Sequence, residues 1–120
     1  LKGSLASLTH SGSIIKNASV CIAIFLDHSR VYDRTKDVQA VGASIQNMLL
    51  TIHSMGLGAV WLGEILKNKE KVAEVLGADK NLELMAVVAL GHPSEKSLRS
   101  STKDESRRRD RLEERVFFRK

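Results

Sequence analysis

The most constraining stretch of this sequence runs from residue 37 to residue 64, where an apolar stripe leads through two glycines into a short apolar run. The members of the stripe, spaced three or four residues apart, are Val38, Val41, Ile45, Met48, Leu49, Ile52 and Met55. That spacing places them on one face of an α-helix, which needs a core to bury it. Residues 59–62 then predict a short buried strand that stops at Gly63 and Glu64.

Residues that favour helix ends flank this stripe and a second, shorter one. Thr35 or Asp37 is a possible N-cap for the long helix. Gly56 suits the left-handed residue that ends many helices. Asn68 is a good N-cap for a second helix, and Gly77 is placed to terminate it. The sequence therefore predicts two helices, one before and one after the 59–62 strand in the chain.

Two further apolar runs predict strands. Residues 19–26 are rich in β-branched and aromatic side chains and suit a strand covered on both faces, with Asp27 at its carboxyl end. Residues 82–90 predict another strand. Three strands separated by helices predict an α/β pattern with a sheet covered on both sides. In an open α/β sheet, ligands tend to bind at the carboxyl ends of the strands.

The net charge of +5 is concentrated near the end of the chain. Nine basic residues lie between positions 99 and 120: Arg99, Lys103, Arg107, Arg108, Arg109, Arg111, Arg115, Arg119 and Lys120. One short basic tail without interleaved aromatics argues against a nucleic-acid partner. Val116, Phe117 and Phe118 are too apolar for a freely solvated end, and we expect them to dock on this subunit or on a partner.

Cysteine content and hydropathy indicate the cellular compartment of the protein. Cys21 is the only cysteine, which excludes an intrachain disulfide and a cysteine-based zinc site. Its apolar neighbours favour a small core residue over a nucleophile. No apolar run approaches the roughly 20 residues of a membrane-spanning helix, and the first residues lack the pattern of a secretory signal. We expect a cytoplasmic protein with no membrane partner.

Motifs for independent chemistry are absent. The sequence contains no P-loop, no GxGxxG, no GxSxG elbow and no helical histidine pair at metal-ligand spacing. Two features remain: Gly63 with Glu64 at the end of a strand, and the basic residues 107–111. A glycine lets backbone N–H groups approach a flat ligand, and arginine suits a phosphate. From spacing alone, a turn glycine and a solvated charge run are the favoured interpretations.

A resemblance to a known family favours ligand binding over these two interpretations. Residues 37–77, DVQAVGASIQNMLLTIHSMGLGAVWLGEILKNKEKVAEVLG, followed by LELMAVVALGHPSEK and RDRLEERVFF, resemble the carboxyl-terminal half of the FMN-dependent nitroreductases. That family shows a GA-x-x-QN-x-LL-A-A-H-x-LGLG-x-x-W-x-G core, a strand ending in LG-x-P and an R-K-P-L-E-like tail. The residues that fit in register are Gly42, Ala43, Gln46, Asn47, Leu49, Leu50, His53, Gly56, Leu57, Gly58, Trp61, Gly63, Gly91 and Pro93.

The resemblance implies an α+β, nitroreductase-like fold with helices packed on both faces of a small sheet. It implies an intertwined homodimer with FMN at the subunit interface, residues 1–98 forming the core and residues 99–120 a basic tail docking on the partner subunit. NADH or NADPH would reduce the flavin, and the flavin would reduce nitroaromatics, quinones or similar small-molecule acceptors.

Carried over by position, the cofactor-binding residues are Leu62, Gly63, Glu64, Arg107, Arg109 and Arg111. The first three would lie along the isoalloxazine, with backbone N–H groups near its N5 edge. Arg109 would approach the FMN phosphate, and Arg107 or Arg111 would substitute if the register slips. Gln46, Asn47 and Trp61 are assigned to packing and helix-terminal hydrogen bonds, and no catalytic side chain or metal ligand is expected.

The sequence also departs from the family pattern. It lacks the Arg-Arg-Ser-type segment of the first helix and the Asn-x-Gln-Pro-Trp-like loop beside the flavin, and Ser19 and Arg111 stand where proline is common. Each lost charge-assisted phosphate contact costs about 1.5–3 kcal/mol. We therefore expect an incomplete fold: either the chain is a piece of a longer protein, or it binds flavin poorly. The alternative function is a flavin-binding or dimerisation module without turnover, and nucleic-acid binding through residues 107–111 is least favoured.

Overall fold

The computed structural model describes residues 1–95, 98 and 110–117 of the 120-residue chain. Its helices and strands are, in chain order, α1 (Lys2–Ala6), α2 (Gly12–Asn17), β1 (Val20–Asp27), α3 (Arg34–Ser54), β2 (Gly58–Leu62), α4 (Lys69–Leu76) and β3 (Leu82–Gly91). The short 3-10 helices are η1 (His28–Arg30), η2 (Glu64–Asn68) and η3 (Leu112–Glu114).

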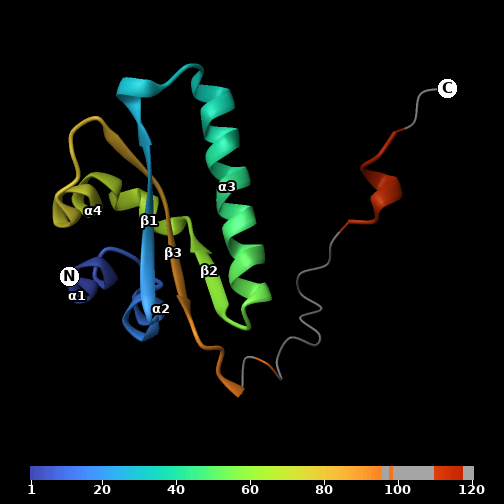
Figure 1. Ribbon diagram of the computed structural model, residues 1–120, viewed down its shortest axis with the longest axis horizontal. Helices are drawn as coiled ribbons and strands as arrows, with labels where there is room; N and C mark the ends of the chain where they lie inside the picture. The colour runs from blue at the N-terminus through green and yellow to red at the C-terminus, as the bar shows by residue number, and fades with distance from the viewer. Residues whose placement is uncertain (96–97, 99–109, 118–120) are drawn as a thin grey trace.

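The strands form one antiparallel sheet in the order β1-β3-β2 (Figure 1). β3 is central, with Val20 of β1 facing Leu90 and Gly58 of β2 facing Gly91. The expected α/β pattern is wrong in this respect: helices separate the strands along the chain, but each neighbour runs antiparallel to β3. The rule that places ligands at the carboxyl ends of parallel strands therefore does not apply to Asp27.

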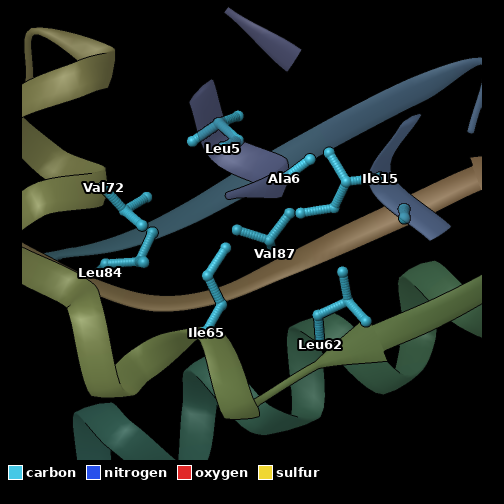
Figure 2. Packing of buried hydrophobic residues seen from close by; sticks show 9 residues of the cluster. Leu5, Ala6, Ile15, Leu62, Ile65, Val72, Leu84 and Val87 are labelled. Atoms are coloured by element: carbon cyan, nitrogen blue, oxygen red, sulfur yellow. The ribbon is translucent and has the colours of Figure 1, made fainter. Parts of the chain in front are cut away.

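Helices cover both faces of the sheet, as predicted, and the fold is α+β. α3 lies along one face and α1, α2 and α4 lie on the other (Figure 1). The larger buried cluster, on the side of the three short helices, contains Leu5, Ala6, Ile15, Leu62, Ile65, Val72, Leu84, Val87 and Ala89 (Figure 2). The smaller cluster, under α3, contains Ile45, Ile52, Ala86 and Val88.

A β-bulge in β3 determines which of its side chains point to each of these two clusters. The register passes over Met85, because Ile24 faces Ala86 whereas the next residue of β1 faces Leu84. Side chains alternate between faces along a regular strand, so an extra residue reverses the alternation. Leu84 therefore packs in the same cluster as Val87, while Ala86 faces α3.

The cap of α3 differs from the predicted one. The helix begins at Arg34, and the Asp33 carboxylate accepts a hydrogen bond from the Lys36 N–H at 2.9 Å. Asp37 lies inside the first turn and accepts from the N–H groups of Tyr32 (2.9 Å) and Asp33 (3.0 Å). The two carboxylates thus form a reciprocal cap around the helix start. The predicted end at Gly56 is confirmed by its φ of +74°.

β2 is more exposed than the prediction of a buried strand. Ala59, Val60 and Trp61 are exposed and only Leu62 is buried. The reason is that β2 pairs with β3 on one side and forms the edge of the sheet on the other. Trp61 keeps a packing role, since its ring lies 3.9 Å from the position that a Cβ on Gly42 of α3 would occupy.

Near the end of the chain, Val116 and Phe117 are 39% and 85% exposed, so the described residues give Phe117 no docking site on its own subunit. Phe118 lies outside the described residues. The division into a core of residues 1–98 and a tail of residues 99–120 stays a prediction. A search of the described part of the chain finds no helix with the length and apolar character to cross a membrane.

Candidate functional site at the end of β2

The turn that follows β2 leaves open space beside a glycine. Leu62 is buried in the larger cluster, and Gly63 directs the chain into η2 with φ −91° and ψ −26°, a conformation open to any residue. A Cβ built on Gly63 would meet no atom within 4 Å. Neither the backbone nor its described neighbours require glycine here. The missing side chain leaves room for a flat group to approach the main chain.

The same turn presents two backbone donors. The N–H groups of Gly63 and Glu64 donate in none of the backbone hydrogen bonds of the described turns, loops and caps, whereas the Gly63 carbonyl accepts from the Leu66 N–H at 3.1 Å. The first N–H groups of a helix have no partner within it. The turn thus places two main-chain donors beside open space, and the contact of residues 62–64 with a flavin stays a prediction.

The side chain of Glu64 turns to the loop between α1 and α2. Its Oε2 accepts from the Thr9 hydroxyl at 2.6 Å and from the His10 N–H at 3.0 Å. These two hydrogen bonds, that of Thr9 first, lower the pKa of the Glu64 carboxyl below its ordinary value. The Glu64 side chain is thus engaged with this loop through Oε2.

A second link joins the far end of η2 to the same loop. Asn68 stands at the predicted N-cap position of α4, but its side chain makes no capping hydrogen bond. Its Nδ2 instead donates to the Leu8 carbonyl at 2.9 Å. The predicted end of α4 at Gly77 is confirmed by its φ of +65°. No sequence signal identified the links to Leu8 and Thr9, because the partners are 55 to 60 residues apart.

Of the three predicted phosphate-binding arginines, Arg111 is the one that belongs to the described residues. Arg107 and Arg109 lie outside the described residues. Arg111 is exposed and precedes η3 with an extended backbone. The structure therefore unites Leu62, Gly63 and Glu64, and the role of the three arginines stays a prediction.

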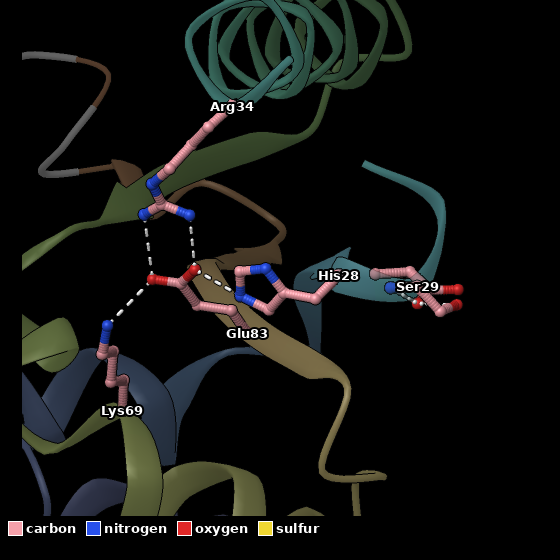
Figure 3. A network of polar contacts seen from close by, with 6 residues as sticks. His28, Ser29, Arg34, Lys69 and Glu83 are labelled. Carbon is pink, nitrogen blue, oxygen red and sulfur yellow. Dashed lines mark hydrogen bonds and ion pairs between the residues drawn. The ribbon is translucent and has the colours of Figure 1, made fainter. Parts of the chain in front are cut away.

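A separate polar cluster, also missed from the sequence, surrounds Glu83 at the start of β3 (Figure 3). Arg34 binds its carboxylate through two nitrogens, at 2.8 and 3.3 Å, Lys69 through Nζ at 2.8 Å, and His28 through Nε2 at 2.9 Å. The bonds from Arg34 and then Lys69 lower the pKa of Glu83 to about 2. These contacts tie together the ends of β1, α3, α4 and β3, beside a cavity of about 770 Å³.

The chemistry available to the described residues is that of binding and orientation. They contain no group of three or more His, Cys, Asp or Glu side chains placed to hold a metal ion. Cys21 is half-buried against the larger cluster, and burial raises the pKa of its thiol. The turn at Gly63 is the place where main-chain donors, open space and a fixed scaffold coincide.

The chain has an α+β fold whose edge strand ends in an open glycine turn, and it shares this fold with a known family. The model of the nitroreductase family matches residues 4–92, and the chain belongs to that family. An Archaeoglobus fulgidus protein, provisionally named NADH dehydrogenase/NAD(P)H nitroreductase, is 33% identical over 87 residues, which cover 70% of this chain and 50% of that protein. The NADPH-flavin oxidoreductase of Vibrio harveyi is 28% identical over 106 residues, or 78% of this chain and 44% of that enzyme.

Solved structures agree with this assignment. A Desulfovibrio desulfuricans protein crystallised in complex with FMN superposes with a TM-score of 0.85 at 38% identity, covering 99% of this chain and 65% of that one. The Vibrio harveyi NADPH:FMN oxidoreductase, solved with NAD+, gives a TM-score of 0.70 at 26% identity over 78% of this chain and 46% of that one. The chain thus spans about half the length of the curated relatives that it matches.

Proposed function

We propose that this chain contributes to an FMN-dependent oxidoreductase, with the turn at residues 62–64 as the part that meets the flavin ring. The observation that carries the proposal is the open glycine turn, in which Gly63 is not required by its own fold and the N–H groups of Gly63 and Glu64 donate in none of the backbone hydrogen bonds of the described turns, loops and caps. Membership of the nitroreductase family and the similarity to a protein crystallised with FMN support it.

The residues present fit the edge of a flat heterocycle. Bound FMN would supply the redox chemistry, taking a hydride from NADH or NADPH and passing electrons to a nitroaromatic, quinone or similar acceptor. The chain itself binds and orients. Leu62 holds the end of β2 in the core, and the following N–H groups donate to acceptor atoms of the ring.

Arg109 is the residue that we assign to the FMN phosphate, with Arg107 and Arg111 as alternatives. Guanidinium groups bind phosphate oxygens through two parallel hydrogen bonds. Residues 107–111 hold four arginines and one aspartate, Asp110, so the segment keeps a net positive charge whichever of the candidates is in register.

A homodimer is the second part of the proposal. Large apolar side chains are exposed on α3, at its C-cap and on the edge strand β2, namely Leu50 (58%), Met55 (68%) and Trp61 (42%). A second copy of the chain would cover them, because exposed apolar groups of this kind mark interaction surfaces. The tail of residues 99–120 would dock on the partner subunit through Phe117, which is 85% exposed. We place the dimer in the cytoplasm, where a half-buried, unpaired Cys21 stays reduced.

The second candidate function is a flavin-binding or dimerisation module without turnover. It needs only what the described residues provide, the open turn at Gly63 and exposed apolar side chains such as Leu50 and Trp61. Flavin binding without oxidation of NAD(P)H would support this candidate, and acceptor-dependent oxidation of NADH or NADPH would exclude it.

The test is an FMN titration of the purified chain, followed by flavin fluorescence and by absorbance. We expect saturable binding and a yellow complex that releases flavin on denaturation. A folded, colourless protein that leaves the spectrum of added FMN unchanged would contradict the proposal.

A further inference from the structure

We propose that Glu64 is a positioning residue, whose side chain latches the turn after β2 to the loop between α1 and α2 and so fixes the two N–H groups at Gly63 and Glu64. The inference rests on the proposed function, since those N–H groups are the ones assigned to the flavin. It adds a role for Thr9, which lies 55 residues from Glu64 in the sequence.

The latch is a directed chain of hydrogen bonds. The Ser11 N–H donates to the Thr9 hydroxyl oxygen at 3.1 Å, and the Thr9 hydroxyl donates its single hydrogen to Glu64 Oε2 at 2.6 Å. The His10 N–H donates to the same oxygen at 3.0 Å. A carboxylate that accepts two such bonds is held more firmly than a neutral acceptor.

Two basic side chains near Glu64 leave the latch oxygen to Thr9 and the His10 N–H. His10 Nε2 lies 3.8 Å and Lys67 Nζ 3.7 Å from Oε1, the carboxylate oxygen that does not accept from Thr9. Both side chains are largely exposed, 88% and 70% accessible. Since exposed ion pairs contribute little, the hydrogen bonds to Thr9 and His10 are the part that fixes the geometry.

The latch acts on the one part of this turn that the core does not fix. Leu62 and Ile65, on either side of the exposed pair, are buried at 5% and 0% exposure. The bond from Asn68 to Leu8 holds the far end of η2. Between these anchors, Gly63 lacks a Cβ, and its carbonyl accepts from the Leu66 N–H at 3.1 Å. The Glu64 side chain adds a second restraint on this turn, through its hydrogen bonds to Thr9 and His10.

The test compares two small changes at Thr9 with a matched change at Thr51. Thr9→Val removes the hydroxyl with little change of shape, Thr9→Ser retains it, and Thr51→Val removes an exposed hydroxyl on α3 that donates to the Asn47 carbonyl at 2.9 Å. Three measurements are made on the 120-residue chain: FMN affinity, thermal midpoint, and the amide signals of Gly63 and Glu64 in the flavin-free protein.

We expect Thr9→Val to weaken FMN binding about tenfold and to shift or broaden the two amide signals, while Thr9→Ser and Thr51→Val behave as wild type. A Thr9→Val protein with wild-type FMN affinity and unchanged amide signals would overturn the latch, even if its thermal midpoint fell. If the wild-type chain binds no FMN, the proposed function fails separately, and the amide signals alone then decide: unchanged signals reject the latch and displaced signals support it.

Discussion

Gly12 and Gly63 are the same residue in opposite surroundings. Gly12 opens α2 against α1, where an added Cβ would stand 2.2 Å from the Ala6 carbonyl oxygen. Gly63 follows β2, where an added Cβ would meet nothing within 4 Å. The fold of the chain itself therefore requires the first glycine and not the second. At Gly63 the fold leaves open space beside the main chain, which is what the proposed contact with a flat ligand needs.

Glu83 and Glu64 show the same contrast. Glu83 is closed in by Arg34, Lys69 and His28, and its side chain is 15% exposed. Glu64 is one-third exposed and holds a loop beside open space. The first carboxylate joins four elements of the scaffold, and the second lies next to the candidate site.

The largest effect on stability is expected at the packed glycine. Gly12→Ala should destabilise the protein by about 3 kcal/mol, because a Cβ at this position overlaps backbone that cannot move aside cheaply. Chemical denaturation measures it. Gly3→Ala is the matched control: it adds a methyl group in α1 with nothing within 4 Å, and should leave stability unchanged or raise it by about 0.5–1 kcal/mol. Equal stabilities for the two variants would break the contrast.

A smaller loss is expected at the closed carboxylate. Glu83→Gln should cost about 1–2 kcal/mol at neutral pH, a value discounted for partial solvent screening. The folded pKa of about 2 lies below the ordinary value of 4.5, so the stabilisation is present above pH 4.5 and is lost as the pH falls toward 2. Urea denaturation between pH 7 and pH 2 should show this slope in the wild type. The slope should be reduced in Glu83→Gln, and identical slopes would contradict the assignment.

The smallest effect on the folded subunit is expected at the exposed apolar surface. Leu50→Glu changes a side chain that is 58% exposed on α3, so the fold of the subunit should change by no more than about 0.5 kcal/mol. The same change places a charge in the proposed dimer interface. Sedimentation velocity should show a dimer for the wild type and a monomer for the variant. A wild-type monomer, or a dimeric Leu50→Glu protein, would reject this interface.

Local patterns in the sequence predicted the parts of the fold that depend on neighbouring residues. The stripe of α3, with Ile45 and Ile52 buried, and the helix ends at Gly56 and Gly77 follow from spacing and from backbone freedom. Pairing between distant segments could not be read in this way. The antiparallel order around β3, and with it the exposure of Trp61 at the sheet edge, depend on contacts across the whole chain.

The candidate site was likewise predictable in its local features and not in its contacts between distant segments. The position of Gly63 at the end of a strand was visible in the sequence, and the resemblance gave it a role. The hydrogen bond from Thr9 to Glu64 was not visible in the sequence. Its two residues are 55 positions apart, and nothing near Thr9 in the sequence marks it as a donor to a distant carboxylate. The cap of α3 shows the same limit on a small scale: the sequence favoured Thr35 or Asp37, whereas Asp33 caps the helix and Asp37 accepts from the N–H groups that precede it.

The central claim is that the turn after β2 presents bare main chain to a flavin, and an FMN titration of Gly63→Ala tests it most directly. We expect a fold as stable as wild type, because the added methyl group meets no atom of the described chain, together with FMN affinity reduced at least about tenfold. Gly3→Ala should bind FMN like the wild type. A Gly63→Ala protein that binds FMN with wild-type affinity would contradict the account.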